Sequence, residues 1–277
     1  MKLPYLLLLF ITACTQQPNP PTKEANQPKT REVIVPEFQP LLDEAEVDGT
    51  ILIYVLEDDQ YYSNDFQWAQ KGFLPASTFK IANSIIALET GVMENDSTLI
   101  RWKGEARAQK VWEQDLILRK AFHYSCVPCY QEIARKVGVE RMRGYLEELD
   151  YGTMVFDSTN LDLFWLQGYS RITPMEQIDF LMRLHQSKLP IAERTEKIMK
   201  RMMLLQDQPN YQLRGKTGWS IDQGKNNAWF VGYVVTTDKT YFFATNIEPK
   251  TPIDRKKFPA VRKEVTFQAL DRMRVHP

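Results

Sequence analysis

The segment AWFVGYVVT at residues 228–236 is followed, after Thr237-Asp238-Lys239, by TYFFATNI at residues 240–247. Both runs are apolar and rich in β-branched and aromatic residues, which is typical of largely buried strands. The three polar residues between them suit a hairpin connection. The stretch therefore predicts two paired antiparallel strands in the C-terminal part of the chain.

Further strands are predicted near the N-terminal end, whereas the middle of the chain has a helical pattern. GTILIYVL at 49–56 is a continuous apolar run, and YYS at 61–63 can return beside it. Apolar residues recur at helical spacing over 78–91, 128–138, 140–149, 173–185, 192–205 and 262–274. This order predicts an α+β fold, in which an antiparallel sheet flanked by helices is completed by both chain ends and an all-helical lobe lies between.

The first residues have the features of an export signal. Met1-Lys2 precedes a short apolar run that is too short to span a bilayer, and small residues follow it. The sequence Ile11-Thr12-Ala13-Cys14 resembles the lipobox of bacterial lipoprotein signals, which implies cleavage before Cys14 and lipid attachment to its thiol. An ordinary signal peptide with an incidental cysteine is the alternative. We expect an exported protein on the periplasmic side of a bacterial membrane, as an outer-membrane lipoprotein.

The chain is expected to fold only after a polar linker. Residues 14–32 are proline-rich and lack apolar periodicity, which predicts a flexible tether after a signal peptide at 1–13. The folded domain is then 33–277. Its predicted sheet-containing parts are 33–75 and 206–277, and its helical part is 76–205.

Composition excludes several classes of function. The chain of 277 residues has 35 Lys and Arg against 35 Asp and Glu, so it lacks the positive field of nucleic-acid binders. Its 3 His, at 123, 185 and 276, lack the paired spacing of a zinc hydrolase. We therefore expect no nucleic-acid partner and no catalytic metal.

A serine and a lysine at the start of the first predicted helix suggest nucleophilic chemistry. In Ser77-Thr78-Phe79-Lys80, the amine lies one turn after the hydroxyl on the same helix face. A serine needs such a base to become a nucleophile, and backbone N–H groups at a helix start can hold an oxyanion. The pattern S-x-x-K is weak by itself, since a capping serine and a solvated lysine would look the same.

Two later motifs strengthen the assignment. Ser125-Cys126-Val127 precedes one predicted helix, and Lys216-Thr217-Gly218 lies in a strand region. S-x-x-K together with K-T-G is the signature of serine β-lactamases and penicillin-binding proteins. The chain therefore resembles these proteins, which implies a serine β-lactamase or penicillin-binding transpeptidase-like fold.

The resemblance is most specific to the class D, or oxacillinase-type, β-lactamases over about residues 38–277. Phe164-Trp165-Leu166 matches their Phe-Trp-Leu element, whereas Tyr151-Gly152-Thr153 departs from their Tyr-Gly-Asn at the third place. The departure puts any contact of that Asn side chain in doubt.

The resemblance implies roles for individual residues. Ser77, Lys80, Ser125 and Lys216 are the implied catalytic residues, and Thr217, Gly218, Trp219 and Arg262 would bind the substrate. Arg262 would grip the β-lactam carboxylate, since its planar fork suits that group. The oxyanion would rest on the backbone N–H groups of Ser77 and Trp219. No diffusible cofactor is implied.

In this family the base is the motif lysine after reaction with carbon dioxide or bicarbonate, which would make Lys80 an N-carboxylated side chain. Only a neutral amine reacts, so the lysine must lie in an apolar pocket that depresses its pKa. Phe79, Val127, Trp165 and Leu166 are the residues that match this carbamate pocket, and the Trp165 indole N–H can donate to the carbamate.

The sequence leaves several alternatives open. A penicillin-binding or β-lactam-sensing protein that acylates without efficient turnover would carry the same motifs. Cys126 and Cys129 form a C-x-x-C, for which we weigh a redox site against two small buried residues; a disulfide between them is undecided. The substrate spectrum and the oligomeric state are also undecided.

Overall fold

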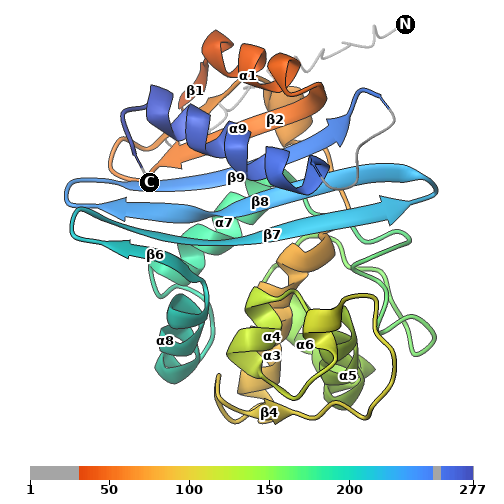
Figure 1. Cartoon of the computed structure of the whole chain (residues 1–277). Helices are drawn as coiled ribbons and strands as arrows, with labels where there is room; N and C mark the ends of the chain where they lie inside the picture. The colour runs from red at the N-terminus through yellow and green to blue at the C-terminus, as the bar shows by residue number, and fades with distance from the viewer. Residues whose placement is uncertain (1–30, 252–256, 277) are drawn as a thin grey trace, which may run out of the picture.

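The computed structural model describes residues 31–251 and 257–276. Its central feature is a seven-stranded sheet with the strand order β1-β3-β2-β9-β8-β7-β6 (Figure 1). Neighbouring strands are antiparallel except β1 and β3, which are parallel. The strands are β1 (Arg31–Ile34), β2 (Val47–Val55), β3 (Gln60–Ser63), β6 (Leu204–Gln208), β7 (Tyr211–Asp222), β8 (Lys225–Thr236) and β9 (Thr240–Pro249).

The predicted hairpin is formed by β8 and β9 in the middle of the sheet. The Thr236 N–H donates to the Lys239 carbonyl oxygen across the turn, at 2.9 Å. Along β8, side chains alternate between two separate hydrophobic cores, with Trp229 in one and Phe230 in the other. The run is apolar without alternation because both faces of the sheet are covered.

Helices from distant parts of the chain cover the two faces. The core on one face includes residues of α1 (Gln39–Glu44), which follows the short helix η1 (Pro36–Phe38), and of α9 (Phe258–Arg272). The opposite face packs against α7 (Pro174–His185). In Figure 1 the strands are seen one below another, with α9 in front of the sheet and α7 behind it.

The remaining helices include those of a lobe built around α3, which contacts α5, α6 and α8. Every residue from Lys80 to Leu88 is buried, so the predicted helix is buried all round and not on one face alone. It ends before Gly91, whose φ of 69° suits the left-handed conformation after a helix. The helices are α2 (Phe66–Ala69), η2 (Ala76–Phe79), α3 (Lys80–Glu89), η3 (Lys110–Trp112), α4 (Leu118–His123), α5 (Val127–Val137), α6 (Val139–Glu148) and α8 (Glu193–Met202).

The lobe departs from the predicted all-helical character. It contains an antiparallel pair, β4 (Leu99–Ile100) with β5 (Leu116–Ile117). The helix α7 lies within the predicted helical part, 76–205, yet it packs on the sheet. Two-residue strands carry no period that a sequence pattern can detect, and helical periodicity does not say which layer a helix joins.

The ends of the sheet also differ from the predicted boundaries. Strand β1 begins at Arg31, inside the segment 14–32 that we predicted as tether, and β6 begins at Leu204 rather than after 205. Both are edge strands joined to one neighbour, β3 and β7 respectively. Backbone hydrogen bonds hold such strands without requiring an apolar pattern.

The predictions for residues 1–30, including Cys14 and its lipid, lie outside the described residues. Within 31–251 and 257–276, no helix has both the length and the apolar character needed to cross a membrane.

Candidate active site

Ser77 lies in the turn that leads into α3. The 3-10 helix η2 (Ala76–Phe79) precedes the α-helix, which starts at Lys80. Ser77 is 8% exposed, and the Lys80 Nζ donates to its Oγ at 2.9 Å. The preceding residue, Ala76, has a φ of 50°, a conformation that L-residues rarely adopt. The structure thus brings the two S-x-x-K side chains into direct contact.

The turn is held by hydrogen bonds from distant elements. The Ala76 N–H donates to the Trp165 carbonyl oxygen at 2.8 Å. The Thr78 hydroxyl donates to the Pro75 carbonyl oxygen at 2.6 Å and accepts from the buried Gln177 amide of α7 at 2.8 Å. Gln177 was not predicted from the sequence, because a polar residue on a helix face carries no signal of its partner.

Lys80 is fully buried, and burial lowers its pKa to about 7. Its Nζ lies 5.1 Å from the centre of the Tyr130 ring. Among the described residues the only hydrogen-bond partner of this Nζ atom is the uncharged Ser77 hydroxyl. Burial without a counter-charge favours the neutral amine, so a large share of Lys80 is uncharged near neutral pH. Tyr130 was not predicted from the sequence.

The four residues predicted as a carbamate pocket belong to one hydrophobic cluster. Phe79 and Trp165 are fully buried with ring centroids 5.1 Å apart, and Val127 and Leu166 are half-buried against the same cluster. The Trp165 Nε1 is buried with no hydrogen-bond partner among the described residues. An indole donor without a partner is costly to bury, so an acceptor at this position would be stabilising.

Ser125 lies between α4 and α5, with a φ of 51°. The Lys216 Nζ of β7 donates to the Ser125 Oγ at 2.5 Å and to the Thr217 carbonyl oxygen at 3.0 Å. Lys216 is 5% exposed. Burial is the largest cause that holds its pKa well below the usual range, and the charges of neighbouring cations lower it further.

Cys126 and Cys129 are joined by a disulfide. The Cys126 Sγ also accepts from the Cys129 N–H at 3.3 Å, at the first turn of α5. Both residues are buried, as the interpretation of two small buried residues expects, and the disulfide decides the pairing that the sequence left open. Spacing alone could not decide whether the two sulfur atoms face each other.

The K-T-G segment lies on a stretch of β7 with an open edge. Strand β6 pairs with β7 only between Tyr211 and Arg214, which leaves the edge from Gly215 onward without a strand partner among the described residues. A Cβ added to Gly218 would lie 3.2 Å from the Pro75 carbonyl oxygen and from Thr78 Cγ2. The absence of a side chain there lets β7 approach the Ser77 turn closely.

Arg262 of α9 reaches the same strand. Its Nη1 donates to the Gly218 carbonyl oxygen at 2.7 Å, and burial lowers its pKa to about 10. Its Nε is buried without a partner among the described residues. Thr217 and Trp219 are half-buried on the same strand. All predicted substrate-binding residues therefore lie on β7 or on the helix that contacts it.

The departure at Thr153 concerns a side chain that is exposed. Its backbone pairs with Arg171, with N–H to carbonyl distances of 2.8 and 2.7 Å in the two directions. The loop conformation is thus held by the backbone at this position.

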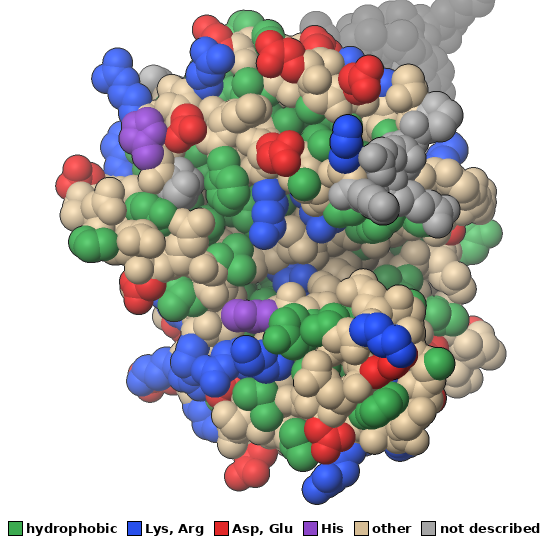
Figure 2. Space-filling model, viewed as in Figure 1, with side chains coloured by type: hydrophobic (Ala, Val, Ile, Leu, Met, Phe, Trp, Pro, Cys, Tyr) green, Lys and Arg blue, Asp and Glu red, His purple; other side chains and the backbone are tan. Residues whose placement is uncertain are grey.

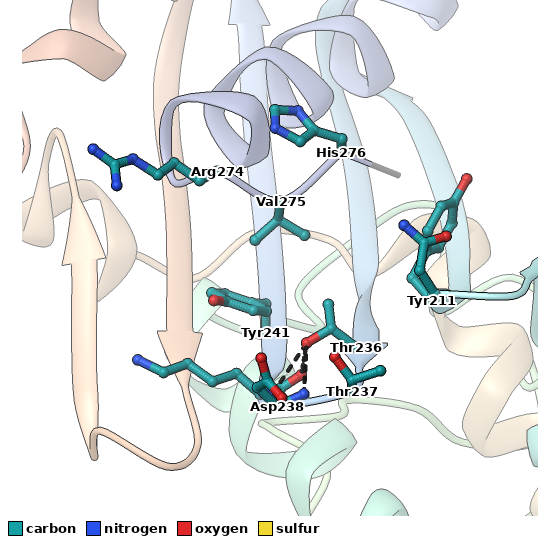
Figure 3. Close-up of a pocket in the computed structure, with 10 residues that line it drawn as sticks. Tyr211, Thr236, Thr237, Asp238, Tyr241, Arg274, Val275 and His276 are labelled. Atoms are coloured by element: carbon teal, nitrogen blue, oxygen red, sulfur yellow. Dashed lines mark hydrogen bonds between the residues drawn. The ribbon is translucent and has the colours of Figure 1, made fainter.

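Figure 2 shows a hollow between the sheet layer and the lobe, with Lys and Arg side chains beside it. A different pocket, of about 340 Å³, lies at the β8–β9 turn and near the end of the chain (Figure 3). Tyr241 and Val275 line it, and no residue of the serine, S-x-V or K-T-G motifs does. Within the described part of the chain, no three His, Cys, Asp or Glu side chains gather as a metal site.

Comparison with known proteins agrees with this fold and site. Residues 25–270 match the family model described as the penicillin binding protein transpeptidase domain. The chain is 40% identical over 220 residues to the beta-lactamase OXA-48 of Klebsiella pneumoniae. The aligned region covers 79% of this chain and 83% of the relative.

Solved structures give the same result. The class D β-lactamase YbXI from Nostoc superposes with a TM-score of 0.82 at 40% identity, covering 86% of this chain and 98% of that one. A class D β-lactamase from Sebaldella termitidis superposes with a TM-score of 0.84 at 33% identity, covering 90% and 100%. The chain belongs to the class D β-lactamase family.

Proposed function

We propose that this protein hydrolyses β-lactams through an acyl-enzyme on Ser77, with the Lys80 side chain as the base. The observation that carries the proposal is the contact between Lys80 Nζ and Ser77 Oγ, at 2.9 Å, in a buried setting that lowers the lysine pKa to about 7. A general base is most effective when its pKa is close to the working pH. The relatives named beta-lactamases support the same reaction.

In the first half of the reaction, the Lys80 side chain removes the Ser77 proton and the Oγ forms a bond to the lactam carbonyl carbon. Backbone N–H groups of Ser77 and Trp219 stabilise the oxyanion. The C–N bond of the lactam then breaks, and Ser125 relays the proton held by the Lys80 side chain to the leaving nitrogen, which leaves Lys80 free to act as a base again. Lys216, which donates to the Ser125 hydroxyl, favours that transfer.

Thr217 and Arg262 hold the substrate carboxylate, close to the strand edge that pairs with the extended acyl chain. In the second half, the Lys80 side chain takes a proton from water, whose oxygen attacks the ester carbon. The Ser77 ester then breaks, and the Lys80 side chain returns that proton to the Ser77 Oγ, which restores the hydroxyl. The net reaction adds one water across the lactam C–N bond.

We further propose that Lys80 works in an N-carboxylated form. Two features of the chain fit this modification: the amine is buried with a lowered pKa, and Trp165 Nε1 is a buried donor without a partner among the described residues. Reaction of the neutral amine with carbon dioxide supplies a carboxylate, which is a base that stays ionised at neutral pH. No glutamate of the kind that other serine β-lactamases use is required.

Intact-mass measurement after incubation with benzylpenicillin tests the proposal, together with hydrolysis of a chromogenic cephalosporin. The wild type should show a transient penicilloyl adduct and rapid hydrolysis, whereas Ser77→Ala should show neither, because the nucleophile is lost. Ser97→Ala, at an exposed loop serine, serves as the matched control.

Two results would contradict the proposal. A penicilloyl adduct on the Ser77→Ala variant would place the nucleophile elsewhere. A stoichiometric adduct on the wild type that never decays would instead indicate a penicillin-binding or sensing protein.

We also propose export and lipid attachment at Cys14, on the basis of the sequence pattern at residues 1–14. A lipid anchor would hold the enzyme at the periplasmic surface of a membrane, most simply as an outer-membrane lipoprotein.

A further inference from the structure

Four basic side chains gather at the active site: Lys80, Lys216, Arg262 and Lys263. The hydrogen-bond partners of the first three among the described residues are hydroxyl or carbonyl oxygens, all uncharged. The charges of Lys80, Arg262 and Lys263 all act on Lys216 and lower its pKa. Lys80 is neutral or N-carboxylated in the mechanism proposed above, but Arg262 and Lys263 have no carboxylate paired to them in the described chain. Their side of the site therefore favours anionic ligands.

Lys263 has no role in the reaction described above. It is half-buried on α9, next to Arg262 in sequence, and its Nζ lies 5.6 Å from the centre of the Phe230 ring. It lines a small cavity of about 70 Å³ together with Lys216, Thr217, Leu205 and His123. No described residue forms an ion pair with it. Its ammonium group therefore stands at a cavity wall beside the K-T-G strand.

The position of this cavity indicates which part of a substrate would reach it. The oxyanion donor that we propose, at Trp219, and the carboxylate anchor, at Thr217, follow each other along β7. The cavity lies further in the same direction, at Gly215 and Lys216, where the β6 pairing ends. A substrate oriented by these two anchors directs its acylamino chain the opposite way, toward Asp222. The cavity thus lies beyond the carboxylate, on the ring side of the substrate.

We propose that Lys263 and this cavity form a subsite for a second anionic group, carried on the ring carbon adjacent to the one that bears the carboxylate. The substrate class is then dianionic cephalosporins whose ring substituent ends in a sulfonate or carboxylate. The inference rests on the proposed function, and it adds a preference among β-lactams.

Two cephalosporins provide a matched pair of probes. Cefamandole and cefonicid share the mandelamido acyl chain and a tetrazolylthiomethyl ring substituent, which ends in methyl in the first and in sulfomethyl in the second. The measurement is kcat/KM for each, in wild type, Lys263→Gln and Lys225→Gln. Lys225 is an exposed lysine at the start of β8, beside the far end of β7, so its variant is the control for net charge.

The ratio of the two kcat/KM values is the readout, because a change at Lys216 caused by removing Lys263 affects both substrates. We expect Lys263→Gln to lower the ratio of kcat/KM for cefonicid to kcat/KM for cefamandole about fivefold. This factor corresponds to the loss of one partly exposed charge pair, which contributes about 1 kcal/mol. Lys225→Gln should leave the ratio unchanged. In the wild type, the ratio should fall as salt rises from about 20 mM to about 0.5 M.

The outcomes separate the two proposals. If both cephalosporins are hydrolysed and the ratio is the same in wild type and Lys263→Gln, the subsite is wrong and β-lactam hydrolysis stands. An equal drop of the ratio in Lys225→Gln would mean that only the general field matters, which also overturns the subsite. If neither cephalosporin is hydrolysed while benzylpenicillin is, the subsite is wrong and β-lactam hydrolysis stands. If benzylpenicillin also fails to acylate Ser77, the proposed function fails and the subsite fails with it.

Discussion

Lys80 shows how one residue takes its chemistry from its surroundings. A lysine in water has a pKa near 10.4 and is a cation at neutral pH. Here the side chain is fully buried, and its Nζ contacts a serine hydroxyl and an aromatic ring instead of a carboxylate. The loss of hydration is not compensated, so the neutral form becomes accessible at physiological pH.

The lowered pKa predicts an acidic limb in the activity profile. As the pH falls through about 7, the Lys80 amine gains a proton, can neither act as a base nor react with carbon dioxide, and the rate declines. Added bicarbonate should restore part of the rate at a given pH. Steady-state kinetics between about pH 5.5 and 8, in degassed and in bicarbonate buffer, check this. A flat profile with no response to bicarbonate would contradict it.

The orphan donor of Trp165 gives a second prediction for a single side chain. Trp165→Phe keeps an aromatic ring against Phe79 but removes the Nε1–H. Losing one hydrogen bond to a charged group should raise the bicarbonate concentration for half-maximal activity about tenfold. Bicarbonate titration of the hydrolysis rate measures it.

Trp102→Phe provides the control, since the Trp102 Nε1 donates to the Glu105 carbonyl oxygen in a loop of the lobe. Equal bicarbonate requirements in wild type and Trp165→Phe would show that the indole donor does not hold a carbamate.

Among the helices and strands, α7 connects the sheet to the nucleophile turn. It packs on β8 and β9, and its Gln177 donates to the Thr78 hydroxyl beside Ser77. Its first turn has a complete capping box: the Thr173 hydroxyl accepts from the Glu176 N–H at 3.0 Å, and the Glu176 carboxylate accepts from the Thr173 N–H at 2.7 Å. The cap satisfies backbone donors that the helix leaves open.

Removing this cap should weaken the entire fold measurably. Thr173→Ala is expected to lower the free energy of unfolding by about 1 kcal/mol, because the Glu176 N–H loses its acceptor. Thr173→Ser keeps the hydroxyl and should stay within a few tenths of a kcal/mol of wild type. Urea unfolding followed by circular dichroism compares the three proteins. Equal stabilities of the Ala and Ser variants would refute the role of the cap.

Across the entire protein, the catalytic groups come from both the helical lobe and the sheet with its covering helix. Lys80 and Ser125 belong to the lobe, whereas Lys216 is on the sheet and Arg262 on the helix behind it. Strand β7 is held in register by β8, whose side chains lie in the hydrophobic cores on both sides of the sheet. A change in the packing between the sheet and the lobe is therefore expected to alter the contact between Lys216 and Ser125.

The location of the protein in the cell follows from the sequence at residues 1–14 and is a prediction. With the intact N-terminal sequence, the wild type should fractionate with the membrane, whereas Cys14→Ser should be recovered in the soluble fraction because it lacks the acylated thiol. Membrane fractionation with metabolic labelling by a fatty acid measures both. Cys126→Ser is unsuitable as a control because it breaks a disulfide, so an exposed change, Ser97→Ala, is used. A wild type found wholly soluble and unlabelled would contradict lipidation.

Features that depend on neighbours along the chain could be predicted from the sequence. The hairpin at 228–247 follows from two apolar runs and a polar turn, and the Ser77 to Lys80 contact follows from the spacing of one helical turn. The family resemblance was readable because its motifs are short and local. For these features, the hydrophobic periodicity and the spacing of residues along the chain are enough to predict which residues lie close together.

Contacts between segments far apart in sequence emerged only in the folded chain. The bond from Lys216 to Ser125 joins residues 91 positions apart, and that from Gln177 to Thr78 joins residues 99 apart. The same holds for the close approach of Gly218 to the Ser77 turn. The burial of Lys80 was expected from the family resemblance, but no local pattern around Lys80 predicts it. Burial and desolvation are set by whichever elements pack around a group. The sequence around a residue does not show which distant elements will surround it. The tertiary structure was therefore needed to show which charged side chains remain without partners.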